Sequence, residues 1–175
     1  MRKEEKELLP VDRFLATLDI VQKEGLHLSF SWDRMFSSGD VSAQWVDALR
    51  NDPAQAEKLE AFVSRYGRMQ DTITDKLLPR WLLALAEKES SRIEVLNRSE
   101  QLGVVENVEY WLEARKLRNA LVHEYMESTQ RFAEDINLAK KYALQFFETY
   151  NNLHAYAQER MELTANLLPS PLELP

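Results

Sequence analysis

The 175-residue sequence has no cysteine, only 4 glycines and no long apolar run. The lack of cysteine excludes disulfide bonds and thiolate metal sites. So few glycines do not suit the many tight turns of a β-rich chain. No run approaches the roughly 20 apolar residues that a membrane-spanning helix needs, and no apolar stretch follows the charged residues 1–7 as it would in a secretory signal. We therefore expect a soluble, cytoplasmic protein that does not associate with a membrane.

Basic charge and histidine are also scarce. The formal net charge is −7, which gives no general attraction to nucleic acid, so any RNA binding must be local. With 3 histidines and no cysteine, a zinc site is not expected. The sequence contains neither a glycine-rich phosphate loop nor the G-x-S-x-G pattern of serine hydrolases. We therefore expect no metal and no other cofactor.

What the sequence does have is apolar residues at helical spacing. This periodicity predicts helices over about 11–21, 53–85, 107–125 and 129–157, with shorter ones near 43–51 and 91–102. The expected fold is an all-α, up-and-down bundle of four to five helices. It would form a single domain over 1–168, followed by a proline-rich tail, 169–175, that is extended or disordered.

Several helix boundaries can be predicted from local chemistry. Asp52 before Pro53 is typical of a helix start, and Ser91 with a glutamate three residues later forms a capping-box pattern. Pro79 should kink or divide the long helix in which it lies, because proline lacks a backbone N–H. Residues 26–32 alternate apolar and polar side chains, which favours a short extended segment.

The first candidate functional residue is Arg118. On a helix that advances about 100° per residue, it falls within the apolar arc formed by residues such as Trp111, Ala114 and Val122. A guanidinium in such a place needs a carboxylate, a phosphate or another strong acceptor. An explanation of Arg118 that requires no function is an ion pair within the core, or an aliphatic stem long enough to place the guanidinium in solvent.

His123 strengthens the case for chemistry. Imidazole is well suited to moving protons near neutral pH, and guanidinium to gripping a phosphate and the charge that grows on it. Arg118 and His123 would thus suffice for phosphodiester cleavage without a metal. Asn119, one helical turn before His123, is positioned to orient the histidine or the substrate.

The eight residues 118–125, RNALVHEY, contain the pattern R-x4-H-x-Y. This pattern resembles the motif of HEPN toxins that are paired with minimal nucleotidyltransferase (MNT) antitoxins. The upstream segment 62–71, FVSRYGRMQD, is also similar to that family, and the resemblance covers most of residues 55–160.

The resemblance implies a HEPN-like bundle that forms a homodimer in which two motifs face one cleft. It implies an endoribonuclease with Arg118 and His123 as catalytic residues and Asn119 in support. Cleavage would proceed by attack of the 2′-hydroxyl and leave a cyclic phosphate. It further implies that a nucleotidyltransferase partner silences the toxin, in some pairs by attaching AMP to the tyrosine that corresponds to Tyr125. Arg65 and Asp71 are possible additional cleft residues.

Two points leave alternatives open. On a regular helix Arg118 and His123 are about 140° apart, so either the helix ends near His123 or two chains build the site together, and we favour the dimer. The acidic net charge favours a second function, that of a non-enzymatic subunit that binds a substrate for a nucleotidyltransferase.

Overall fold

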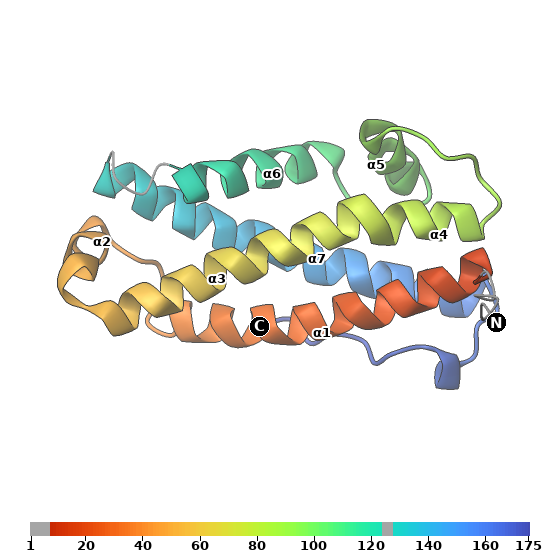
Figure 1. Cartoon of the computed structure of the whole chain (residues 1–175), viewed down its shortest axis with the longest axis horizontal. Helices are drawn as coiled ribbons and strands as arrows, with labels where there is room; N and C mark the ends of the chain where they lie inside the picture. The colour runs from red at the N-terminus through yellow and green to blue at the C-terminus, as the bar shows by residue number, and fades with distance from the viewer. Residues whose placement is uncertain (1–7, 124–127) are drawn as a thin grey trace, which may run out of the picture.

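The computed structural model describes residues 8–123 and 128–175, and these residues form helices and no strands (Figure 1). The prediction of an all-α fold is confirmed. More helical segments are present in this part of the chain than the four to five expected. They are α1 (Pro10–Phe36), α2 (Ala43–Ala48), α3 (Pro53–Thr72), α4 (Leu78–Ala84), α5 (Arg92–Gln101), α6 (Val108–His123) and α7 (Thr129–Arg160), with a π-helical turn at Ile73–Leu77 and 3-10 turns at Leu49–Asn51 and Ala165–Leu167.

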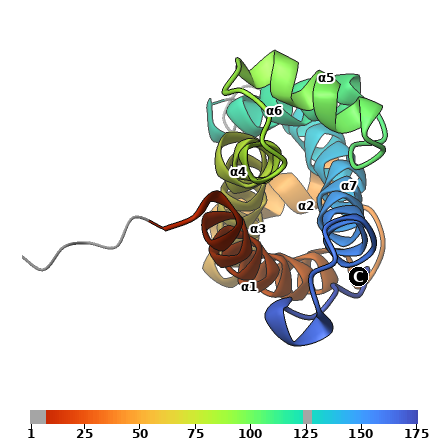
Figure 2. The same ribbon diagram turned by 90° about the vertical axis from the view of Figure 1, so that its right-hand side faces the viewer.

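The long helices run up and down. Figure 1 shows α1, the continuous rod of α3 and α4, α6 and α7, each opposite in direction to the one before it. Seen from the end, α3 lies between α1 and α6, and α7 closes the ring on the far side (Figure 2). The core fills the interior of this ring with aromatic and aliphatic side chains. No helix in the described ranges is long and apolar enough to cross a membrane.

The helix starts predicted at Asp52 and Ser91 are confirmed, and Ser128 caps a third helix. The Asp52 carboxylate accepts a hydrogen bond from the backbone N–H of Gln55, 3.2 Å away. Ser91 forms a full capping box with Glu94. The Ser128 hydroxyl accepts from the backbone N–H of Arg131 and so begins α7. These side chains satisfy N–H groups that the first helical turn leaves without partners.

The prediction of an extended segment over 26–32 is wrong, because α1 continues without a break to Phe36. The buried positions Val21, Gly25, Leu28 and Met35 follow helical spacing and face the core. The Leu172 side chain occupies the space that a β-carbon at position 25 would need. A glycine fits within this helix at that point, and a larger residue would require Leu172 to shift. The sequence pattern resembled a strand because Phe30 is apolar although its position on the helix faces solvent, where it is 57% exposed.

The long helix is divided near Pro79, as the proline predicted, and a π-helical turn separates its two parts. The backbone N–H of Leu78 donates to the carbonyl of Ile73, five residues back. Pro79 cannot donate a hydrogen bond and its ring would crowd the carbonyl four residues earlier. The wider turn at Ile73–Leu77 accommodates both effects, and the rod of α3 and α4 bends between the two helices (Figure 1).

The C-terminal segment is extended, and it is packed against the bundle. Asn151 on α7 donates to the carbonyl of Leu172 and accepts from its N–H, at 2.8 and 2.9 Å. The Tyr150 hydroxyl donates to the carbonyl of Ser170 at 2.8 Å. Leu172 itself is buried against α1. These contacts tie residues 169–175 to the same core as the helices.

Candidate functional site

Helix α6 carries the sequence-predicted residues, and its buried face fixes how they point. Trp111, Ala114, Leu117 and Leu121 are buried along one side of α6. The hydroxyl of Tyr66 on α3 donates to the backbone carbonyl of Ala114 at 3.1 Å, which ties α6 to α3 across the interface. Burial raises the pKa of the Tyr66 hydroxyl, so it stays a neutral donor. Arg118 and Asn119 follow on the next turn.

Arg118 lies at the edge of the apolar face. Its side chain is 39% exposed, which corrects the expectation of a cation set deep in an apolar arc. The stem of Arg118 crosses α3 at Gly67, where a β-carbon would lie 3.0 Å from its Nε and 3.3 Å from its Cγ. Gly67 therefore makes room for Arg118 to lie across α3.

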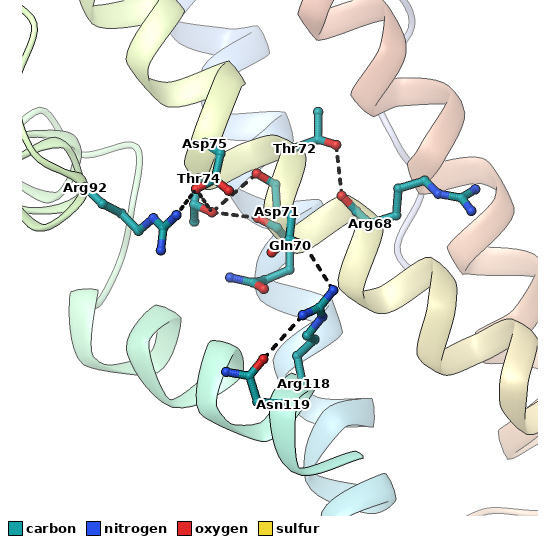
Figure 3. A network of polar contacts seen from close by, with 9 residues as sticks. All are labelled: Arg68, Gln70, Asp71, Thr72, Thr74, Asp75, Arg92, Arg118 and Asn119. Carbon is teal, nitrogen blue, oxygen red and sulfur yellow. Dashed lines mark hydrogen bonds and ion pairs between the residues drawn. The ribbon is translucent and has the colours of Figure 1, made fainter. Parts of the chain in front are cut away.

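Among the described residues, the guanidinium of Arg118 has two side-chain partners (Figure 3). Its Nη2 lies 3.4 Å from Oδ2 of Asp71, and its Nη1 donates to Oδ1 of Asn119 at 3.3 Å. Asp71 is itself 41% exposed. A pair this accessible to water contributes at most about 1 kcal/mol, so a phosphate can displace the carboxylate at small cost.

Arg118 also lines a pocket of about 510 Å³ between α3, α6 and α7. Its walls are mostly apolar, and Arg118 is the cation among them. The lining residues are Leu59, Glu60, Val63, Ser64, Gly67, Arg118, Leu121, Val122 and Phe132. A mostly apolar cleft whose polar side chains are Arg118, Glu60 and Ser64 suits a ligand that combines a flat or apolar body with an anionic group that pairs with the guanidinium.

The other predicted residues divide into three groups. Asp71 joins Arg118, as described. Arg65 does not, because its Nη1 donates to the Ser31 hydroxyl and the His27 carbonyl of α1, on the opposite flank of α3. His123 is the last described residue of α6, and its side chain and the whole of Tyr125 lie outside the described residues, so the end of the helix near His123 stays a prediction.

Gln70 is a buried polar residue next to Asp71 that sequence reasoning missed. It is 1% exposed, and neither its Nε2 nor its Oε1 has a hydrogen-bond partner among the described residues. It lies beside Asp71 and Arg118 in Figure 3, one turn before the π-helical turn. On the facing helix, the Nη1 of Arg115 is also buried with no hydrogen-bond partner in the described part of the chain. A polar residue within the apolar stripe between Tyr66 and Ile73 was the available signal.

Among the described residues no group of three or more histidine, aspartate or glutamate side chains converges as a metal site would require. Comparisons with known proteins found no matching family model, no matching curated protein and no matching solved structure.

Proposed function

We propose that the protein is a HEPN-like endoribonuclease, the toxin of a toxin–antitoxin pair, and that it cleaves RNA with Arg118 and His123. The observation that carries the proposal is the position of Arg118. Its guanidinium lines a pocket of about 510 Å³ and, among the described residues, is ion-paired with one exposed carboxylate, that of Asp71, while His123 lies five residues later on the same helix.

The proposed roles of Arg118 and His123 follow from the chemistry of their side chains. Arg118 would bind the scissile phosphate and stabilise the charge that accumulates on it. His123 would move a proton, either from the attacking 2′-hydroxyl or to the departing 5′-oxygen. Asn119, which already accepts a hydrogen bond from Arg118, would hold the guanidinium in orientation. The 2′-oxygen forms a bond to phosphorus as the bond to the 5′-oxygen breaks, leaving a 2′,3′-cyclic phosphate.

The cleavage step uses both a base and an acid, whereas each chain supplies one histidine in this motif. We therefore propose a homodimer in which the ends of two α6 helices meet. The exposed side chain of Val122, at 54%, stands beside the Arg118 pocket and is an apolar surface that a second chain would cover. The second histidine would then serve as the complementary proton carrier.

The direct test is to incubate the purified protein with RNA in EDTA. We expect cleavage to continue at an unchanged rate, because arginine and histidine replace the metal in this mechanism. RNA that stays intact under these conditions, and cells that grow normally when the protein is expressed, would remove the ribonuclease proposal.

We also propose Tyr125 as the point at which an MNT-type antitoxin acts. AMP attached there would add negative charge and bulk to the R-x4-H-x-Y motif, seven residues from Arg118 in the sequence, and repel an incoming phosphate. With the partner and ATP, we expect the protein to gain the mass of one or more AMP groups on Tyr125 and to lose cleavage. A Tyr125→Phe variant that is still fully silenced by ATP and partner would contradict this route.

The second candidate is a non-enzymatic subunit that presents a substrate to a nucleotidyltransferase. The net charge of −7 favours it, because surfaces that bind RNA are normally basic. It shares the pocket and Arg118 with the first candidate but needs no proton transfer. Binding of a ligand that depends on Arg118 and is indifferent to His123, with no cleavage, would support this second function.

A further inference from the structure

A second pocket lies on the opposite flank of α3 from the Arg118 pocket. It has a volume of about 380 Å³ and is formed between α1 and the first half of α3. We call it the α1–α3 pocket. Its lining residues are Phe30, Ser31 and Arg34 from α1, and Ala54, Glu57, Lys58, Ala61 and Arg65 from α3.

The lining of this pocket carries a net positive charge, although the protein as a whole is negatively charged. Three cations, Arg34, Lys58 and Arg65, line it against the single carboxylate of Glu57. In the described part of the chain, no carboxylate lies within ion-pairing distance of any of the three. With three cations and one carboxylate in its lining, the pocket has a net positive local charge and attracts an anion.

One of these cations is held in place. The Nη1 of Arg65 donates to the Ser31 hydroxyl at 2.7 Å and to the His27 carbonyl at 3.2 Å. A guanidinium has five N–H donors, so the remaining donors stay available for a ligand. An arginine that is already oriented loses less side-chain entropy when it binds a phosphate than a free one does.

An exposed aromatic ring completes the pocket. Phe30 is 57% exposed, and the guanidinium of Arg34 lies 5.5 Å from the centre of its ring. An aromatic face beside several cations is the combination by which proteins hold single-stranded nucleic acid, with the ring stacking on a base and the cations facing the phosphates. A simple anion site would not need the ring, and an apolar partner would not need the cations.

We propose that the α1–α3 pocket is a second nucleotide subsite, which binds an unpaired base of the RNA on Phe30 and an adjoining phosphate with Arg34, Lys58 and Arg65. The proposal rests on the proposed function for the identity of the ligand. The Arg118 pocket and the α1–α3 pocket flank the same stretch of α3, residues 54–67. A helix is about 10–12 Å across, so one RNA strand that crosses α3 reaches both.

The test measures binding without cleavage. A His123→Ala protein is titrated into a short fluorescein-labelled, single-stranded RNA, and fluorescence anisotropy gives the affinity. Adding Phe30→Ala should weaken binding roughly fivefold to a hundredfold, the loss expected for one stacked base. Phe30→Trp should retain the affinity. Adding Lys58→Ala should weaken binding and lower the slope of log affinity against log salt by about one.

Matched controls separate the pocket from general effects. Ile20→Ala removes another exposed apolar side chain of α1, 47% exposed, and Lys141→Ala removes an exposed cation of α7. Both should leave the affinity unchanged. An unlabelled RNA duplex should compete less well than the single strand, because its bases are already stacked. Thermal melts of every variant verify that each one is folded.

The outcomes distinguish this inference from the proposed function. If Arg118→Ala weakens RNA binding while Phe30→Ala and Lys58→Ala do not, the second subsite is overturned and the ribonuclease proposal stands. If the two pocket variants weaken RNA binding but the unaltered protein never cleaves RNA, the subsite stands and the ribonuclease proposal fails. Loss of binding to an acidic protein partner alone, with RNA binding intact, would also overturn the subsite.

Discussion

Replacing Arg118 with alanine should slow RNA cleavage by at least about a hundredfold, the usual loss when one donor to a transition-state anion is removed. The protein should remain folded, because the side chain is 39% exposed and its ion pair with Asp71 is accessible to water. The measurement is the initial rate on a labelled RNA in EDTA. His123→Ala should cause a loss of about a hundredfold or more for a different reason, since it removes proton transfer.

Lys116→Ala is the matched control for Arg118→Ala. Lys116 is also a cation of α6 and also has one carboxylate partner, Glu113 at 3.0 Å, but its side chain is 75% exposed and does not line the pocket. Its removal should leave the rate within about twofold. Gly67→Ala offers a gentler change to the site, because the added β-carbon would meet Arg118 at 3.0 Å and displace it. Equal losses in Lys116→Ala and Arg118→Ala would mean that net charge, and not the site, sets the rate.

Replacing Trp111 with alanine should lower the free energy of unfolding by about 3–5 kcal/mol. Trp111 is 2% exposed on α6, and its ring centre lies 5.0 Å from that of Phe146 on α7. The substitution leaves a large cavity at the contact that holds α6 against α7. Because α6 also carries Arg118, cleavage should fall together with the folded fraction. Chemical denaturation of both proteins measures the difference.

The neighbouring residue supplies the control. Tyr110 is 44% exposed on the same helix, so Tyr110→Ala removes an aromatic ring that is much less buried than that of Trp111. It should change the free energy of unfolding by less than about 1 kcal/mol. If Trp111→Ala were as mild as Tyr110→Ala, the packing of α6 described above would be wrong.

Much of the fold could be predicted because helices of this protein carry their own start signals. Asp52, Ser91 and Ser128 each cap the helix that follows them, and the apolar periodicity marks the faces that pack. The failure over 26–32 has a physical cause. A strand and a helix both place residues such as Leu28 inside, and the position of Phe30 is not decided by burial because its side chain stays exposed.

Less of the candidate site than of the fold could be predicted from the sequence. The helical angle placed Arg118 within the apolar arc of α6, but it could not show that the side chain would leave that arc across a glycine of another helix. The partner carboxylate comes from Asp71, 47 positions earlier, and only the packing of α3 on α6 brings the two together. Likewise, Arg65 faces α1 because α3 is covered on both flanks, which no periodicity along α3 alone reveals.

The α1–α3 pocket could not be found from the sequence for a related reason. Phe30 and Arg34 are one turn apart, so their proximity is local and predictable. Lys58 and Arg65 reach the same place only through the packing of α3 against α1. A net charge of −7 also hides a local excess of cations, because composition averages over the whole surface.

The central claim is that Arg118 and His123 cleave RNA by activating its own 2′-hydroxyl. The measurement that tests it most directly is mass spectrometry of the fragments released in EDTA by the unaltered protein. Fragments ending in 2′,3′-cyclic phosphate, and absent from Arg118→Ala and His123→Ala reactions, are the predicted result. Fragments ending in a 3′-hydroxyl, or the same fragments from the His123→Ala protein, would contradict the account.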